Sequence, residues 1–432
     1  MKIAVCTLGC KTNQFECQAM EKLFADQGYD VVSADSEADG YVVNSCTVTS
    51  TADKKTRQML RHLRRAHPEA LIAVCGCMTQ VDEGDVREQC GVDLVGGNRD
   101  FKSFVTVVDE ALRERKLVAE TVANDYPAFQ TLPAGGLSGR TRALLKVEDG
   151  CENFCSYCII PYARGPIRSL PLEKAIEETK KLCAQGYKEI VLTGIEISAY
   201  GIDLRPQLSI CDLLEAVCAA AGEARISLGS LKPTVIDEEF CRRLSKLPNL
   251  CRHFHLSLQS GCTETLARMN RKYGADDILR AVSLLRTYFD EPNLTADIIV
   301  GFPGETEEEF AETLATLRTC SLGDAHIFPY SVRKGTKAES FSGKHTNAVK
   351  KTRAAECAAV CTELRNAYLD RWIGTMQRVL AEEGRDGSVG GYTDRYLFVR
   401  IENGETVARG SYADVLVTGR RGGELIGEAI AR

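Results

Sequence analysis

Residues 150–166, GCENFCSYCIIPYARGP, carry three cysteines within eight positions: Cys151, Cys155 and Cys158. They follow an apolar run at 144–147 that predicts a buried strand, so the cysteines are expected on a loop that leaves a strand end. Thiolates are the ligands of iron–sulfur clusters and of many zinc sites. A structural zinc site takes four protein ligands, and the nearest histidines in the sequence are His67 and His253. The spacing therefore favours a cluster held by three thiolates over a zinc site or a packing loop.

The chain on either side of this loop predicts a partial parallel barrel. Six apolar runs are typical of buried strands, and each except the last is followed by a helical pattern. Six such β/α units predict a partial (β/α)6 barrel, in which chemistry lies at the carboxyl ends of the strands. The runs are residues 144–147, 189–193, 225–228, 253–258, 294–300 and 325–330.

The first 115 residues predict a second α/β unit, a doubly wound parallel sheet. Its apolar runs lie at 3–8, 41–43, 71–74 and 92–95, with helical periodicity at 14–27, 52–65 and 101–115.

Three cysteines follow the first three of these runs: Cys10, Cys46 and Cys77. Ligands of parallel sheets gather past the carboxyl ends of the strands, so the fold is expected to bring these thiols to one sheet edge. Cys75 competes with Cys77, but its place inside the apolar run favours a role in the core.

The remaining segments predict a linker, a helix and a small all-β unit. Residues 120–142 lose periodicity and gather Pro, Gly and Ser, which is typical of a linker. A helical pattern spans 346–372, and Trp372 is expected in the core at the junction that follows. From 375 to 432, short alternating segments separated by Gly-rich turns predict a small β barrel of the OB-like class.

Composition sets limits on the protein class. The chain has 432 residues, 44% of them apolar and 26% charged, which excludes general disorder. The net charge of −6 gives no overall attraction to phosphate or anionic lipid. The first apolar stretch is too short for a signal peptide, and no stretch approaches membrane-spanning length. We therefore expect a cytoplasmic protein without membrane contact, in which clustered cysteines indicate metal or redox chemistry.

The C-x3-C-x2-C loop resembles the signature of the radical S-adenosylmethionine superfamily, with Tyr157 at the usual aromatic position. The resemblance implies a 4Fe-4S cluster that reduces bound S-adenosylmethionine to a radical able to remove hydrogen from an unactivated carbon. Three segments at predicted strand ends agree with it: 192–201, 257–262 and 297–306. They supply candidate contacts to the cofactor, although glycines also serve turns and Gln259 and Asp297 equally suit structural hydrogen bonds. The candidates are Thr193, Gly194, Gln259 and Asp297.

Taken together, the two cysteine trios and the terminal β unit resemble the methylthiotransferase family over essentially the whole chain. The resemblance implies two 4Fe-4S clusters, two S-adenosylmethionine molecules per turnover, an electron donor and a sulfur source. It also implies three domains: an N-terminal domain at 1–115, a radical core at 137–367 and an RNA-binding TRAM domain at 369–432. The implied cluster ligands are Cys10, Cys46 and Cys77, and Cys151, Cys155 and Cys158.

Within the family, residues 6–14 (CTLGCKTNQ) and 326–338 (HIFPYSVRKGTKA) most resemble the branch that acts on tRNA bearing N6-threonylcarbamoyladenosine. This branch converts that nucleoside, next to the anticodon, to its 2-methylthio form. Other branches read GCQMN or LGCPKN at the first site and modify isopentenyladenosine or a ribosomal-protein aspartate. Glu196 departs from the expected histidine. A zinc-holding RNA-binding protein without turnover is the alternative from another class.

Binding of the tRNA anticodon loop requires basic groups. On the helix expected from residue 52, five basic residues recur at three- and four-residue steps with no acid between them. Such a stripe suits a solvated helix face and phosphate contact equally well. In the terminal β unit, Arg420, Arg421, Tyr392 and Tyr396 are candidates for local charge and base stacking. The stripe consists of Lys54, Arg57, Arg61, Arg64 and Arg65.

Overall fold

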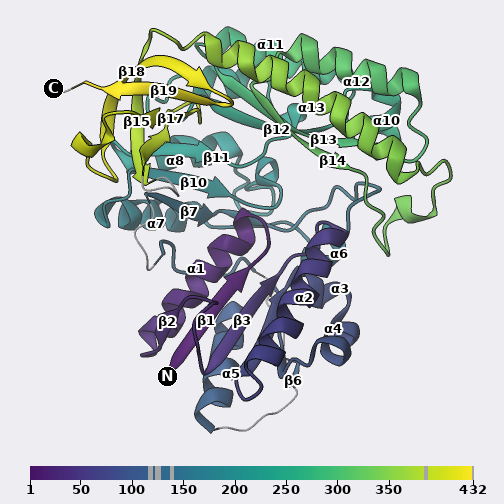
Figure 1. The fold of residues 1–432 in the computed structure, drawn as a ribbon, viewed down its shortest axis with the longest axis vertical. Coiled ribbons are helices and arrows are strands. Elements are labelled where there is room, and N and C mark those ends of the chain that lie inside the picture. Colours follow the sequence, from purple (N-terminus) through teal and green to yellow (C-terminus); the bar gives the residue numbers. More distant parts are fainter. Residues whose placement is uncertain (115–119, 122–127, 137–140, 384–387, 431–432) are drawn as a thin grey trace.

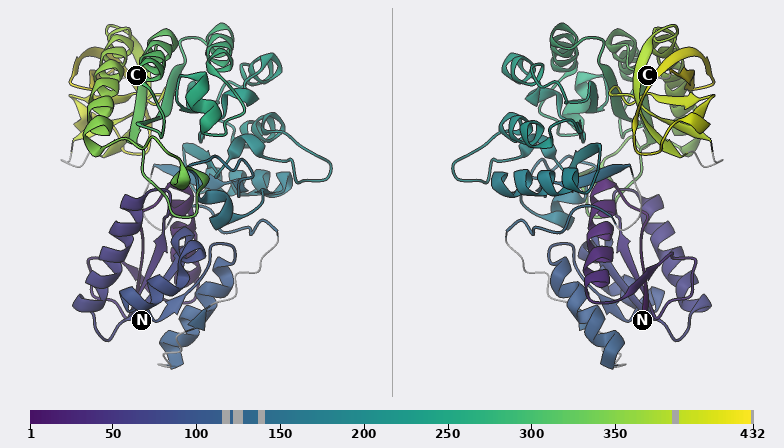
Figure 2. Two further views of the ribbon diagram at one scale, coloured as in Figure 1. Left: turned by 90° about the vertical axis from the view of Figure 1, so that its right-hand side faces the viewer. Right: turned by 90° about the vertical axis from the view of Figure 1, so that its left-hand side faces the viewer.

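The structure of the chain is a computed structural model that describes residues 1–114, 120–121, 128–136, 141–383 and 388–430. Figure 1 shows three successive parts: an N-terminal sheet with helices on both faces, a central array of strands and helices, and a C-terminal barrel. Figure 2 shows the N-terminal part at one end of the molecule and the C-terminal barrel at the other end, where it lies beside helices of the central array.

The N-terminal sheet is parallel throughout, with strand order β2-β1-β3-β4-β5-β6. Successive side chains of its strands point to opposite faces of the sheet, so alternate residues pack into two separate hydrophobic cores. Ile3 and Val42 pack with α1 and α5, while Ala4 and Val43 pack with α2. The predicted doubly wound sheet is confirmed, and the two short strands β2 and β6 were not predicted. The strands are β1 (Lys2–Thr7), β2 (Asp30–Val32), β3 (Gly40–Ser45), β4 (Leu71–Gly76), β5 (Leu94–Val95) and β6 (Glu120–Thr121).

Five helices cover this sheet. The periodicity at 14–27, 52–65 and 101–115 corresponds to α1, α2 and α5, although Arg115 lies outside the described residues. The helix α2 begins at a Thr49 cap, whose side chain accepts a hydrogen bond from the N–H of Ala52 at 3.1 Å. The helices are α1 (Lys11–Asp26), α2 (Ser50–Ala66), α3 (Cys77–Val81), α4 (Glu83–Cys90) and α5 (Phe101–Glu114).

The predicted linker is only partly a connector. Residues 120–121 form the edge strand β6, and 122–127 and 137–140 lie outside the described residues. Between them, Leu132 and Ala134 are buried and join the main hydrophobic core. The expectation of a linker was wrong for this portion, because its apolar side chains pack.

The central part holds six parallel strands in two groups of three, ordered β11-β10-β7 and β12-β13-β14. Isolated bridges from Ile226 to Leu250 and from Leu231 to Leu256 connect the groups. The strands match the six predicted runs to within two residues, so the partial (β/α)6 barrel is confirmed. They are β7 (Arg142–Lys146), β10 (Glu189–Thr193), β11 (Arg225–Leu228), β12 (His253–Gln259), β13 (Asn293–Val300) and β14 (Asp324–Pro329).

Helices follow these strands on the outside, and a short strand pair lies at the start of the array. The helices are α6 (Ile160–Arg164), α7 (Leu172–Ala184), α8 (Ile210–Ala221), α9 (Glu238–Leu244), α10 (Thr263–Arg268), α11 (Ala275–Tyr288) and α12 (Glu307–Cys320), and the pair is β8 (Glu148–Asp149) and β9 (Arg168–Ser169).

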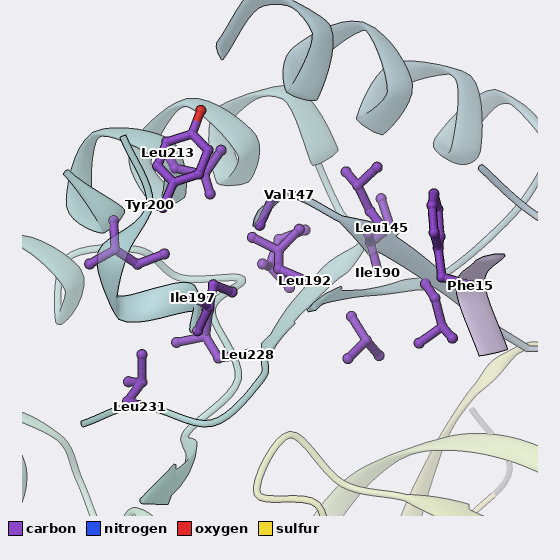
Figure 3. Close-up of a cluster of buried hydrophobic side chains, with 14 of the residues drawn as sticks. Phe15, Leu145, Val147, Ile190, Leu192, Ile197, Tyr200, Leu213, Leu228 and Leu231 are labelled. Atoms are coloured by element: carbon purple, nitrogen blue, oxygen red, sulfur yellow. The ribbon is translucent and has the colours of Figure 1, made fainter. Parts of the chain in front are cut away.

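Figure 3 shows that Phe15 of α1 lies beside Leu145 of β7, within one buried cluster. The N-terminal and central parts therefore share a hydrophobic core.

The chain ends in a closed barrel with strand order β15-β16-β17-β19-β18, reached through α13 (Asn347–Asp370). Trp372 is buried at this junction, edge-on to Tyr368 and beneath the Arg395 guanidinium at 4.5 Å, as predicted. No described helix combines the length and apolarity needed to cross a membrane. The barrel strands are β15 (Met376–Glu383), β16 (Val389–Tyr392), β17 (Phe398–Ile401), β18 (Tyr412–Arg421) and β19 (Glu424–Ala429).

Closure of this barrel requires a glycine at position 391. A Cβ atom there would overlap the backbone carbonyl oxygen of Leu380 on the neighbouring strand β15. We expect Gly391→Ala to destabilise the protein by about 1–3 kcal/mol, because backbone cannot yield as a flexible side chain does. Chemical denaturation followed by circular dichroism measures the change.

The matched control is Gly419→Ala on β18 of the same barrel, where a Cβ meets nothing within 4 Å. It should change stability by less than about 1 kcal/mol. Equal effects of the two variants would contradict the packing argument.

Candidate active site

The first cysteine trio lies on the loop between β8 and α6. Its turns are held by backbone bonds from Cys151 N to Gly165 O at 3.0 Å and from Cys158 N to Cys155 O at 2.9 Å. Burial, with smaller contributions from the other thiols, raises the pKa of Cys151 to about 11 and that of Cys158 to about 12. Three closely spaced thiols in a dry loop are stable as thiolates only beside a compensating cation.

Two side chains already point N–H groups at these sulfurs. Asn153 Nδ2 lies 3.2 Å from Cys151 Sγ, and Arg271 Nη1 lies 3.2 Å from Cys155 Sγ. Arg271 is fixed in turn by its bond to the carbonyl of Ser257 at 2.7 Å. Hydrogen bonds to the ligating sulfurs tune iron–sulfur clusters, so this set of residues fits a 4Fe-4S cluster held by three thiolates.

The structure brings the second cysteine trio to one edge of the N-terminal sheet. The strands β1, β3 and β4 are neighbours in the sheet, and each is followed within three residues by one cysteine, namely Cys10, Cys46 and Cys77 in that order. Burial raises the pKa of Cys77 to about 12, and the negative charges of Cys46 and Cys10 add to this effect. The rival Cys75 lies within β4 and is fully buried in the hydrophobic core.

A short polar network shapes the turn that carries Cys10. Cys10 caps α1, and Asn13 Oδ1 accepts bonds from its backbone N–H at 3.3 Å and from its thiol at 3.2 Å. Asn13 Nδ2 donates to Asn44 Oδ1 at 2.9 Å, which ties this turn to the end of β3. The thiol of Cys10 is therefore oriented by Asn13 of α1, which is itself held by Asn44 at the end of β3.

An entirely buried arginine connects the two trios, and sequence reasoning missed it. Arg164, in α6 just after the first trio, donates from Nε to Cys77 Sγ at 3.1 Å. Its Nη1 donates to Glu16 Oε1 at 2.6 Å and to Asp149 Oδ1 at 3.1 Å, and Lys146 Nζ bonds the same two carboxylates. Burial alone would raise the pKa of Asp149, but Arg164 and Lys146 hold that pKa below its ordinary value. The sequence signal was Glu16, a charge flanked by Phe15 and Cys17.

A cavity of about 840 Å³ opens beside these groups, and all three parts of the chain line it. Cys10 comes from the N-terminal part, Thr193, Gly194 and Asp297 from the central strand ends, and Tyr396 from the C-terminal barrel. Thr12 Oγ1 donates to the carbonyl of Gly194 at 3.3 Å, which docks the start of α1 onto the central part.

Three of the four candidate cofactor residues thus line one cavity, whereas Gln259 does not. Gln259 ends β12 in the left-handed region, with φ 69°. A Cβ at Gly194 would lie 2.6 Å from the Glu148 carboxylate, so glycine is required there. Glu148 is buried, and its Oε1 has no hydrogen-bond partner among the residues that the structure describes. This vacant acceptor beside Gly194 suits the ammonium group of S-adenosylmethionine.

One oxygen of the Asp297 carboxylate is bonded by protein groups, and the residue also lines the cavity. Its Oδ1 lies 3.2 Å from His255 Nε2 and 3.3 Å from His326 Nδ1. Thr295 Oγ1 bonds His255 Nδ1 at 2.8 Å and His253 Nε2 at 2.9 Å. The hydrogen bond to Asp297 raises the pKa of His326, while burial lowers that of His253 to about 3.

Glu196, the departure from the family pattern, lies beside the first trio. Its Oε2 accepts from Asn153 Nδ2 at 2.8 Å and is 3.4 Å from Lys232 Nζ. Because Asn153 also bonds the Cys151 sulfur, Glu196 helps to orient a donor to that sulfur.

The basic stripe of α2 is less free than the sequence indicated. Arg57 pairs with Asp82 at 3.0 Å and Arg64 with Asp93 at 2.5 Å, since acids distant in sequence fold against the helix. Arg65 Nε bonds the carbonyl of Arg61, and Lys54 is exposed.

The barrel candidates are also engaged within the chain. Arg420 pairs with Asp370 at 2.5 Å, and Arg421 is exposed. Tyr392 stacks on Tyr396 at 4.5 Å, and Tyr396 on His253 at 5.0 Å. These rings join the barrel to the central part.

The partial barrel and its cysteine loop define the class of radical S-adenosylmethionine enzymes. Comparison with known proteins agrees with this class. Residues 145–317 match the radical SAM superfamily, and residues 2–97 match the uncharacterized protein family UPF0004. The fold resembles the radical S-adenosylmethionine methyltransferase TsrM from Kitasatospora setae, with a TM-score of 0.56 at 14% identity, covering 76% of this chain and 72% of TsrM. A 4Fe-4S cluster and S-adenosylmethionine are the cofactors of this class.

The chain belongs to the methylthiotransferase family of these enzymes. It is 36% identical over 410 residues to the threonylcarbamoyladenosine tRNA methylthiotransferase MtaB of Bacillus subtilis, covering 93% of this chain and 91% of that protein. It is 32% identical over 443 residues to the tRNA-2-methylthio-N(6)-dimethylallyladenosine synthase of Geobacillus kaustophilus, covering 99% and 83%.

Removing the buried arginine should be costly. Arg164→Met leaves Glu16 and Asp149 buried without their guanidinium, so we expect a loss of about 3–5 kcal/mol in the free energy of unfolding. Thermal and denaturant unfolding measure it. Lys174→Met, which breaks an exposed pair with Glu177, is the control and should cost less than about 1 kcal/mol. A mild effect at Arg164 would contradict the network's role.

Proposed function

We propose that this enzyme is a tRNA methylthiotransferase that converts N6-threonylcarbamoyladenosine next to the anticodon to its 2-methylthio derivative. The observation that carries the proposal is the cavity in which Cys10 meets the Thr193–Gly194 strand end. The proteins named above that match most of this chain support a tRNA substrate, and MtaB supports the threonylcarbamoyl group. The proposal places the enzyme in the cytoplasm, where tRNA is modified.

In this proposal the two trios have different roles. Cys151, Cys155 and Cys158 hold the cluster that works with S-adenosylmethionine, and Thr193, Gly194, Gln259 and Asp297 contribute to the cofactor and base pocket. Cys10, Cys46 and Cys77 hold a second 4Fe-4S cluster. When bound, these groups supply hydrogen-atom removal from an unactivated carbon and a sulfur species to replace that hydrogen. Arg164 holds the loop that carries the first trio in a fixed position relative to the sheet edge that carries the second.

The proposed domains are 1–115, 137–367 and 369–432, the last a TRAM domain that binds RNA. Lys54, Arg61 and Arg65 are the proposed phosphate contacts on α2, with Arg421 on the barrel. Arg57, Arg64 and Arg420 complete the proposed basic set, beside the acids they pair with. A single-stranded loop is the form of RNA whose bases are free to enter a cavity.

Nucleoside mass spectrometry of total tRNA tests the function. A strain lacking the gene should lose the 2-methylthio form of threonylcarbamoyladenosine and accumulate the unmodified nucleoside, and the intact gene should restore it. Unchanged levels in the deletion strain would contradict the proposal. Loss of the isopentenyladenosine derivative instead would assign the enzyme to that branch.

Cysteine variants separate the two cluster sites. Cys155→Ala should abolish both cofactor cleavage and product, whereas Cys46→Ala should keep cleavage and lose product. Iron analysis, cleavage assays and product assays on anaerobically purified protein measure this. Cys75→Ala, two residues from Cys77 but in the core, is the matched control and should keep its iron and product. Methylthio product from Cys46→Ala would refute the second cluster.

A further inference from the structure

Lys11 occupies an unusual place in the cavity. It is the first residue of α1 and directly follows Cys10, and both residues line the 840 Å³ cavity. Lys11 also lines an adjoining cavity of about 420 Å³ with Arg142 and Tyr396. Its side chain is exposed, and its charge adds to the lowering of the His253 pKa by burial and opposes the rise of the His326 pKa that Asp297 causes. The ammonium group therefore faces the space that a substrate would enter.

The acids that line both cavities have positive or imidazole partners. In the larger cavity Asp324 pairs with Arg365 at 2.7 Å, Glu424 with Arg400 at 3.4 Å, and Asp297 with two histidines. In the smaller one Glu382 pairs with Arg142 at 2.9 Å and Glu383 with Arg409 at 2.5 Å. The side-chain ammonium of Lys11, by contrast, has no hydrogen bond or ion pair with any residue that the structure describes. An anion entering the larger cavity would thus meet one uncompensated positive charge.

The chemistry of the substrate gives that charge a partner. We propose that Lys11 binds the carboxylate of the threonylcarbamoyl group, an inference that rests on the proposed function. In adenine, C2 and the N6 substituent flank N1 on the same edge of the ring. A protein that delivers sulfur to C2 must therefore hold the N6 substituent close to the sulfur donor, and Lys11 is the neighbour of the proposed cluster ligand Cys10.

This contact also selects against apolar substituents. An ammonium–carboxylate bond is charge-assisted and stronger than a neutral hydrogen bond. An uncharged substituent such as an isopentenyl group would strip water from Lys11 and return no partner, which is unfavourable. Lys11 then discriminates between modified adenosines as well as binding one of them.

The test compares two synthetic anticodon stem-loop RNAs that differ at one group. One carries threonylcarbamoyladenosine and the other its carboxyl methyl ester, which removes the charge and keeps the shape. With the reconstituted wild-type enzyme, kcat/KM should be about 10- to 100-fold higher for the acid, the range of a hydrogen bond to a charged group. Equal conversion of acid and ester would overturn the inference without touching the proposed function. Conversion of neither RNA would contradict the proposed function, and the inference with it.

Variants assign the preference to Lys11. Lys11→Gln should convert acid and ester equally, and Lys11→Arg should restore a preference for the acid. Lys22→Gln, on the same helix but outside the cavity lining, is the matched control and should keep the wild-type preference. Iron content and cofactor cleavage should match the wild type in all three. If Lys11→Gln lowers both rates by the same factor, Lys11 contacts a backbone phosphate or the cofactor, and the inference is wrong.

Discussion

The guanidinium of Arg164 is the group on which the arrangement of this enzyme depends. A charge removed from water is tolerated only with close partners, and those partners are Glu16 of α1 and Asp149 of the central part. The same group bonds the sulfur of Cys77. One planar side chain thereby fixes the sheet edge that carries one trio against the loop that carries the other. Shared apolar packing, with Phe15 beside Leu145, excludes water from the contact.

Because this contact fixes the parts of the chain against one another, they are able to line a single cavity. Cys10, the Thr193–Gly194 strand end and Tyr396 of the barrel belong to three separate parts, yet they line one space. In the proposed function one site removes hydrogen and the other delivers sulfur, and both must reach the same carbon, which a flexible connection would not ensure. The Tyr392–Tyr396–His253 stack holds the barrel over the same cavity.

Periodicity and cysteine spacing predicted the strands and the sheet edge because both are local properties. Four apolar runs and three helical patterns were enough to predict the sheet edge at which Cys10, Cys46 and Cys77 lie together. The ion pairs were not predictable, since Arg64 and Asp93, or Arg164 and Glu16, meet only after folding. For the same reason the stripe on α2 looked free of acids, and the stretch around Leu132 looked like a linker. At Asp297 the sequence left two roles open, and only the positions of His255 and His326 show how its carboxylate is bonded.

The pairing of Glu16 with Arg164 has a consequence for how the chain is made. The two residues are 148 positions apart, so Glu16 leaves the ribosome well before its partner. At about 5–20 residues per second, that delay is roughly 7–30 s. During this interval the N-terminal sheet is able to form, but the face of α1 that carries Glu16 must stay hydrated. The edge bearing Cys10, Cys46 and Cys77 is then still uncovered, which gives the proposed second cluster a period in which iron and sulfide have direct access to its ligands.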